Sequence, residues 1–163
     1  MDSNFMKAAI EMAEQGMNAG HGGPFGAAVV QVHANGTKEL ISCEHNRVLQ
    51  TNDPTMHAEV AAIRAACEKL GRFSLHDCVI YSTCMPCPMC MSAIMWAKIP
   101  WLYYGAGMDD AAEVGFDDEY MYDFFRKGKE VGCSEKLRIE VTDVAACRQL
   151  FEQWKNKADR NMY

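Results

Sequence analysis

Long hydrophobic runs are missing from this 163-residue sequence. No apolar stretch approaches the roughly 20 residues that a membrane span requires. The N-terminal segment is interrupted by Lys7, Glu11 and Glu14, at about one charge per helical turn. We therefore expect neither a membrane span nor a signal peptide, and we interpret the segment as an amphipathic helix.

Positive charge is also scarce. The chain has 16 Lys and Arg residues against 22 Asp and Glu residues, which gives a formal net charge of −6. An acidic chain repels phosphate backbones unless its basic side chains cluster on one surface. Nucleic acid is therefore not the expected partner.

The eight cysteines do not indicate a disulfide scaffold, because such scaffolds usually serve much shorter secreted chains that lack a core. Cys84, Cys87 and Cys90 lie within seven residues of one another, which is typical of a metal or catalytic site in a reducing compartment. We therefore expect a cytoplasmic protein. We predict that the other cysteines are small buried hydrophobic residues: Cys43, Cys67, Cys78, Cys133 and Cys147.

The length and the alternation of apolar patterns predict a single domain over residues 1–163. Asn35-Gly36 favours a tight hairpin turn, and Asp53 with Pro54 favours a helix start. Strands that alternate with helices predict a layered α/β domain with helices on both faces of the sheet. The predicted helices cover about 4–18, 53–70, 86–98, 117–127 and 144–157, and the predicted strands cover 22–32, 38–45, 78–83, 101–106 and 136–141.

The motifs HAE (57–59) and PCPMC (86–90) supply the ligand types of a zinc centre. A catalytic zinc is held by three protein ligands and keeps one position for water. His57, Cys87 and Cys90 give that number. The two cysteines lie three residues apart at a predicted helix start, where the positive end of the helix favours thiolates.

Glu59 is the additional member of this group. Zinc lowers the pKa of a bound water far enough to supply hydroxide near neutral pH. A carboxylate that is not a ligand can then take up the proton that the water loses and pass it on. We assign this proton-shuttle role to Glu59. Because residues two apart in a regular helix point in nearly opposite directions, His57 and Glu59 can share one centre only at a helix end.

Other interpretations fit the same motifs. A single Cys-x-x-Cys is often redox-active or structural, and a lone histidine beside alanines is often a core residue. Cys84 would allow a closed structural zinc site with three cysteines, although it fits better as the last residue of a buried strand. Together, however, His-x-Glu and Pro-Cys-x-x-Cys match the signature of the zinc-dependent base deaminases.

Four longer stretches resemble the bacterial guanine deaminases of the cytidine deaminase-like family, and the resemblance covers nearly the whole chain. These stretches are GGPFGA (22–27), NDPTMHAEVAAIR (52–64), PCPMCMSAIMWA (86–97) and DAAEVGFDD (110–118). The resemblance implies a three-layer α/β/α fold, which we expect to hold a five-stranded mixed sheet. It also implies one zinc per chain, a small purine substrate, and a homodimer that exchanges C-terminal segments, here about residues 144–163.

The same resemblance implies that Phe25 stacks on the purine and that Asn46 and Asp118 form hydrogen bonds with it. It also implies that Tyr163 closes the pocket. If the C-terminal segments are exchanged, Tyr163 closes the pocket of the partner subunit. The products would be xanthine and ammonia. Met85 departs from the family pattern, which usually has glutamate there.

Plainer roles remain open for these positions. Phe25 fits a core residue, the Asp117–Asp118 pair fits a solvated helix cap, and Tyr163 fits a disordered chain end.

Two other functions also remain open. One is a deaminase of guanosine or another nucleoside or aminoheterocycle, or of tRNA adenosine, for which the charge of −6 is unfavourable. The other is a zinc-stabilised binding module without turnover.

Overall fold

The computed structural model describes residues 3–126, 133–134, 137–138 and 141–158. The chain divides into two compact units, Met1–Glu119 and Tyr120–Tyr163. No helix in these described ranges is both long enough and apolar enough to cross a membrane. The first unit contains α1 (Ser3–Asn18), β1 (Gly26–Val32), β2 (Lys38–His45), α2 (Val48–Thr51), α3 (Ala58–Leu70), β3 (Cys78–Cys84), α4 (Pro88–Trp96), β4 (Trp101–Ala106) and α5 (Met108–Glu113).

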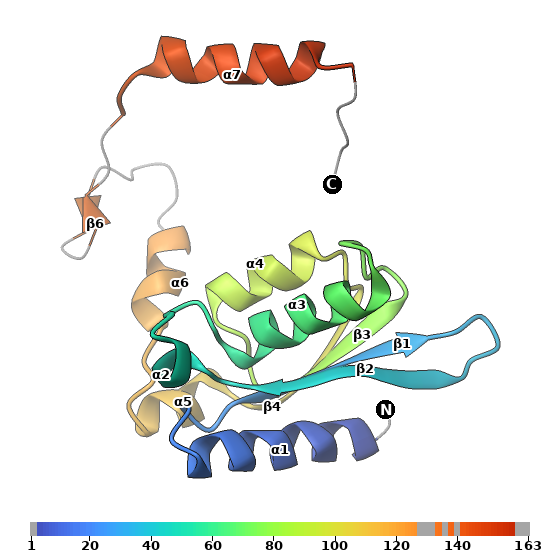
Figure 1. Cartoon of the computed structure of the whole chain (residues 1–163). Helices are drawn as coiled ribbons and strands as arrows, with labels where there is room; N and C mark the ends of the chain where they lie inside the picture. Colours follow the sequence, from blue (N-terminus) through green and yellow to red (C-terminus); the bar gives the residue numbers. More distant parts are fainter. Residues whose placement is uncertain (1–2, 127–132, 135–136, 139–140, 159–163) are drawn as a thin grey trace. The chain divides into compact units, whose positions relative to one another are not determined.

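The sheet of the first unit has four strands in the order β2-β1-β3-β4. β1 pairs antiparallel with β2 and β3, whereas β3 and β4 are parallel, so the sheet is mixed. α1 covers one face, and α3 and α4 cover the other (Figure 1). The predicted three-layer α/β/α architecture is therefore confirmed.

The two faces of the sheet hold separate cores, because successive side chains of a strand point to opposite sides. Along β1, Ala28 and Val30 belong to the cluster beneath α1, and Ala27 and Val29 belong to the cluster beneath α3 and α4. Alanines at Ala58, Ala62 and Ala66 line the inner face of α3. Their small side chains let the helix approach the sheet closely.

The prediction of a fifth strand in the main sheet is wrong for the described residues. Leu137–Arg138, within the predicted strand 136–141, form β6, which pairs antiparallel with β5 (Cys133–Ser134) in a separate two-stranded sheet. The β pattern of KLRIEV indicated an extended segment but could not identify its pairing partner. The second unit also contains α7 (Val144–Asn156), and α6 (Glu119–Arg126) begins at the last residue of the first unit.

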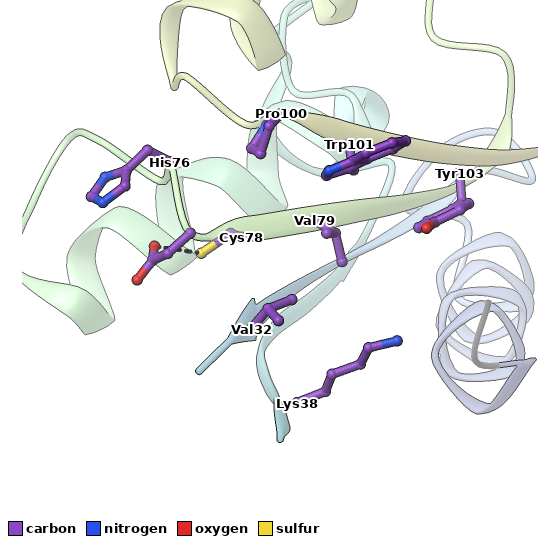
Figure 2. A pocket seen from close by; sticks show the side chains of 9 residues that line it. Val32, Lys38, His76, Cys78, Val79, Pro100, Trp101 and Tyr103 are labelled. Atoms are coloured by element: carbon purple, nitrogen blue, oxygen red, sulfur yellow. Dashed lines mark hydrogen bonds between the residues drawn. The ribbon is translucent and has the colours of Figure 1, made fainter. Parts of the chain in front are cut away.

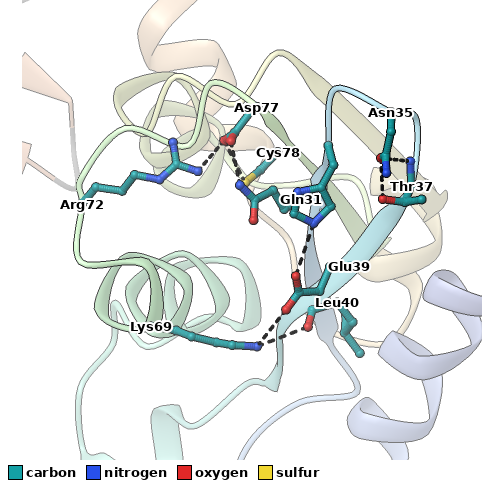
Figure 3. Close-up of polar contacts among 10 residues, drawn as sticks. Gln31, Asn35, Thr37, Glu39, Leu40, Lys69, Arg72, Asp77 and Cys78 are labelled. Carbon is teal, nitrogen blue, oxygen red and sulfur yellow. Dashed lines mark hydrogen bonds and ion pairs between the residues drawn. The ribbon is translucent and has the colours of Figure 1, made fainter.

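The β1–β2 hairpin forms where predicted, but its turn is wider. Val32 pairs with Lys38, which leaves a five-residue loop from His33 to Thr37. The Asn35 side-chain oxygen accepts hydrogen bonds from the backbone N–H of Thr37 at 3.0 Å and from its hydroxyl at 2.7 Å (Figure 3). Gly36 has a φ of 82°, which explains why the loop needs glycine there.

Helix α3 begins later than predicted. Asp53 accepts hydrogen bonds from the Thr55 N–H at 2.8 Å and the Thr55 hydroxyl at 2.7 Å, so it closes a local turn and does not cap the helix. His57 is the N-cap residue, with extended backbone angles of −68° and 158°. The predicted ligand His57 therefore lies just outside the helix, and Glu59 lies in its first turn.

The turn that leads into β3 is held by a carboxylate. Asp77 accepts hydrogen bonds from Arg72 at 2.5 Å and from Gln31 at 2.8 Å (Figure 3). Burial raises the pKa of Asp77, but these bonds outweigh burial and hold the pKa at about 2. Because the folded pKa lies below the unfolded one, this stabilisation is present above about pH 4 and is lost as the pH falls toward 2.

The cysteines outside the PCPMC region are less uniform than predicted. Cys78 is buried, Cys43 and Cys67 are half-buried, and Cys147 is exposed. The prediction of a buried side chain is therefore wrong for Cys147, because it lies on α7, where all the described side chains are exposed. The side chain of Cys133 lies outside the described set. All seven described cysteines are free thiols.

Candidate metal and catalytic site

Two helix starts on the same face of the sheet carry the predicted ligands. His57 is the N-cap of α3, and Cys87 is the N-cap of α4. Pro88 occupies the first position of α4, where its missing N–H costs no hydrogen bond, and Cys90 follows in the first turn. The packing of α3 against α4 brings the two helix starts together.

The three side chains form a cluster of the right size for zinc. The Nδ1 of His57 lies 3.7 Å from the Cys87 sulfur and 3.6 Å from the Cys90 sulfur. Zinc bonds of about 2.3 Å to sulfur and about 2.0 Å to nitrogen, at a tetrahedral angle, place nitrogen and sulfur about 3.5 Å apart. Among the described residues, this is the one cluster of histidine, cysteine and carboxylate side chains with the dimensions of a metal site.

Cys84 does not belong to the cluster. It is the last residue of β3, as predicted, and its thiol donates a hydrogen bond to the Gly107 carbonyl at 3.5 Å. The closed four-ligand alternative therefore has no support in the described residues. Three protein ligands leave one position for a water or a substrate atom.

The local electrostatics favour a thiolate at Cys87. A hydrogen bond from Cys90 and a second from His57 lower the pKa of Cys87 to about 4, although burial opposes them. The bond to Cys87, together with burial, raises the pKa of Cys90. The hydrogen bond with Cys87 also raises the pKa of His57. A cation between the three groups would replace the protons that they share here.

Glu59 is held beside the cluster by the neighbouring strand. Its carboxyl is only 5% exposed and accepts a hydrogen bond of 2.8 Å from the Ser82 hydroxyl on β3. Burial raises the pKa of Glu59. A buried carboxyl with a raised pKa can both accept and return a proton near neutral pH. Ser82 was not among the predicted site residues, although the polar pair Ser82–Thr83 near the end of an otherwise apolar strand was a usable signal.

Phe25 lies at the edge of the core. It is half-buried against the core beneath α3, and its ring meets Phe116 edge-to-face, with ring centroids 4.9 Å apart. Phe116 belongs to the GFDD stretch but was not predicted as a site residue. Because the two rings are nearly perpendicular, they do not form one flat surface, and a planar base can stack on the face of one ring only.

Asn46 is 5% exposed and follows the last residue of β2. Its backbone N–H donates to the Phe25 carbonyl at 3.0 Å, and its side-chain oxygen accepts the Val48 N–H at 3.1 Å. The chain segments that carry Phe25 and Asn46 are thus joined directly.

The paired aspartates have different environments. Asp117 accepts the N–H of Glu119, the first residue of α6, at 3.0 Å, so it closes a local turn before the helix as Asp53 does before α3. Asp118 is half-buried, and burial, followed by the nearby charge of Cys87, raises its pKa. Asp118 therefore lies within electrostatic reach of the ligand cluster. Tyr163 lies outside the described residues.

A cavity of about 340 Å³ lies at the opposite end of β3, where residues from the starts of β3 and β4 line it (Figure 2). Trp101 and Tyr103 form one wall, and His76 and Lys38 contribute polar groups. None of its lining residues belongs to the ligand cluster, and the Asp77 carboxylate is already bound by Arg72 and Gln31. This cavity therefore lacks the groups that deamination needs.

Comparison with known proteins agrees with the geometry. Residues 1–106 match the model of the cytidine and deoxycytidylate deaminase zinc-binding region. The chain is 42% identical to the guanine deaminase of Bacillus subtilis over 159 residues, which is 98% of this chain and 97% of the relative. It is 49% identical to a tRNA-specific adenosine deaminase of Agrobacterium fabrum, but over only 67 residues, 41% of this chain and 44% of the relative.

The X-ray structure of guanine deaminase from Bacillus subtilis superposes on this chain with a TM-score of 0.89 and 41% identity, covering 100% of this chain and 99% of the other. The fold and the motif thus point to the same group of proteins, and the resemblance seen in the sequence is confirmed. The chain belongs to the cytidine and deoxycytidylate deaminase zinc-binding family.

Proposed function

We propose that the chain is a zinc-dependent hydrolase that converts guanine and water to xanthine and ammonia. The deaminase chemistry is supported by the cluster of His57, Cys87 and Cys90 with the buried Glu59 beside it. The choice of guanine is supported by the similarity to the Bacillus subtilis guanine deaminase along 98% of this chain.

The residues of the cluster have separate tasks. His57, Cys87 and Cys90 hold zinc, which when bound supplies a Lewis acid that lowers the pKa of water. Glu59 takes a proton from the attacking water and gives it to a ring nitrogen. The water oxygen joins the carbon that carries the amino group. Glu59 then takes the remaining proton from that oxygen and passes it to the amino group, and the carbon–nitrogen bond breaks to release ammonia. The Ser82 hydroxyl fixes the carboxyl in place for both transfers.

The substrate contacts follow from the neighbouring groups. We propose that Phe25, supported by Phe116, stacks on the base. Because the Asn46 oxygen is occupied by the Val48 N–H, Asn46 presents its amide N–H groups to an acceptor on the purine. Asp118 accepts hydrogen bonds from the ring N–H groups of the purine. By the family resemblance alone, we propose that Tyr163 closes the pocket; this residue lies outside the described part of the chain.

A substrate panel tests this function. Purified protein is assayed for ammonia release from guanine, guanosine, adenine, cytosine, ammeline and a tRNA with a wobble adenosine. We expect guanine to give the highest kcat/KM, because a site that hydrogen-bonds specific ring groups rejects analogues that lack them. Turnover of tRNA without turnover of guanine would instead assign the chain to the tRNA deaminases. Bound zinc without release of ammonia from any of these compounds would support a binding module.

We also propose that the chain is a cytoplasmic homodimer with exchanged C-terminal segments (about residues 144–163). The free thiols suit a reducing compartment. Large apolar side chains on α4 and β4 are exposed, with Met95 at 71%, Trp96 at 67% and Trp101 at 62%, and such surfaces are typical of subunit contacts. Light scattering is expected to give twice the mass of one chain, and a monomeric mass at micromolar concentration would contradict the dimer.

A further inference from the structure

The side chains of His21 and His45 are in contact, close in the chain to the proposed substrate contacts Phe25 and Asn46. His21 lies in the glycine-rich loop before β1, and His45 is the last residue of β2. The Nδ1 of His21 lies 2.9 Å from the Nε2 of His45, and the two rings are nearly parallel, with centroids 5.1 Å apart. This distance is that of a direct hydrogen bond between two imidazoles.

We assign the direction of that hydrogen bond from the neighbouring groups, because the ring positions alone fit either tautomer. The Gln50 side-chain nitrogen lies 3.4 Å from the Nε2 of His21, and because an amide nitrogen only donates, this ring nitrogen is the acceptor. His21 then carries its proton on Nδ1 and donates it to His45. His45 in turn carries its proton on Nδ1, which is buried and has no hydrogen-bond partner among the residues that the structure describes.

The backbone around the pair joins the same two segments. The N–H groups of Leu49 and Gln50 both donate to the His21 carbonyl at 3.0 Å. A Cβ added at Gly22 would lie only 2.0 Å from the Asn46 side-chain oxygen, so the loop packs directly on Asn46. The loop that leads to Phe25 and the segment that carries Asn46 therefore form one unit. The His21–His45 bond and the longer Gln50–His21 contact are the side-chain links between them.

Helix α1 fixes the position of the pair. A Cβ added at Gly16 would lie 2.2 Å from the Cδ2 of His45, so the His45 side chain packs directly against the helix backbone. The His21 N–H also donates to the Gly16 carbonyl at 2.9 Å. The end of α1 thus locates both histidines, and His45 has no space to move toward the helix.

We propose that His21 and His45 form a positioning pair that holds Asn46 and Phe25 in the geometry that binds the purine. The pair acts through these two residues and does not touch the reacting atoms. This inference rests on the proposed function, because it concerns substrate binding at the same site. It predicts an effect on KM, with the chemical step largely preserved.

The protonation state of His45 decides whether the bond persists. Burial lowers the pKa of His45, and the positive charge of Arg47 and the proximity of His21 lower it further. Arg47 is itself paired with Glu44, α2 contributes the neutral Gln50, and α1 contributes only the Gly16 backbone at this point. A proton on the Nε2 of His45 would make both rings donors. The bond is therefore intact above the lowered pKa and is lost as the pH falls through it.

The test compares guanine kinetics from pH 5 to 8 in wild-type protein and in the variants His45→Leu, His45→Gln and His33→Gln. His45→Leu removes the acceptor and is expected to raise KM about tenfold, with kcat within about threefold. His45→Gln can still accept from His21 but cannot ionise. It is expected to return KM at pH 7.5 close to the wild-type value and to abolish the rise in KM that wild type shows at acidic pH. His33, in the β1–β2 loop with its side chain 40% exposed, provides the matched control.

An unchanged KM in His45→Leu, or an equal acidic rise in KM for His45→Gln and wild type, would overturn the proposal. If His45→Leu does not fold, the pH comparison between His45→Gln and wild type decides the question. Nitrogen-15 NMR of the imidazoles needs no substrate and is expected to show Nδ1–H on His21 bonded to the Nε2 of His45. A spectrum without a hydrogen bond between the two imidazoles would refute the pair. Absence of guanine turnover in wild-type protein would instead refute the proposed function.

Discussion

Replacing Glu59 with glutamine is expected to lower kcat for guanine about a thousandfold or more, while one zinc per chain is retained. Glutamine keeps the size of the side chain and can still accept the Ser82 hydrogen bond, so the local structure should persist. It cannot take up a proton, however, and both transfers assigned to Glu59 are lost. Ammonia release and zinc content are measured on the same preparation.

Glu68→Gln is the matched control, because Glu68 lies on the same helix with an exposed side chain. We expect wild-type turnover in this variant. Activity of Glu59→Gln within a few fold of wild type would remove Glu59 from the mechanism. Loss of zinc in Glu59→Gln would show that the carboxyl supports the metal site, which the present assignment of a non-ligand role does not allow.

Replacing Cys90 with serine is expected to remove most of the bound zinc and, with it, detectable turnover. Cys90 is buried and fully enclosed by α4 and its neighbours, and its sulfur lies 3.6 Å from the His57 nitrogen. A serine hydroxyl reaches less far and is a much poorer zinc ligand than a thiolate. Because a metal that binds only the folded state stabilises that state, the melting temperature should also fall.

Metal analysis after dialysis gives the zinc content, and thermal unfolding with and without a chelator gives the contribution to stability. Cys67→Ser serves as the control, since Cys67 is half-buried on α3 and is not part of the cluster. Full zinc occupancy and normal activity in Cys90→Ser would exclude Cys90 as a ligand. A chelator should lower the melting temperature of wild type and of Cys67→Ser but leave that of Cys90→Ser nearly unchanged.

Sequence patterns predicted the metal site better than they predicted its surroundings. His57, Cys87 and Cys90 have fixed spacings, and their side chains have a strong preference for zinc, so the chemistry could be inferred before the fold was known. The condition that His57 and Glu59 meet only at a helix end was also met, because His57 is the N-cap of α3. The helix start itself was misplaced, since Asp53 uses its carboxylate in a local turn that competes with capping.

Longer-range arrangements were not readable in the same way. The extended pattern of KLRIEV contains no information on which strand it joins, and its described residues Leu137–Arg138 pair with Cys133–Ser134. Ser82, Phe116 and the His21–His45 pair depend on contacts between residues far apart in the chain. Single residues of these types occur throughout soluble proteins, so only the assembled fold shows that they gather around the site.

The nitrogen of His57 and the sulfurs of Cys87 and Cys90 are expected to hold a single zinc that keeps one open position. X-ray absorption at the zinc edge of the purified wild-type protein tests it most directly. We predict two sulfur neighbours at about 2.3 Å and two lighter neighbours at about 2.0 Å, one of which exchanges when a purine analogue is added. A shell of three or four sulfurs, or a spectrum unchanged by every aminopurine tested, would contradict the claim.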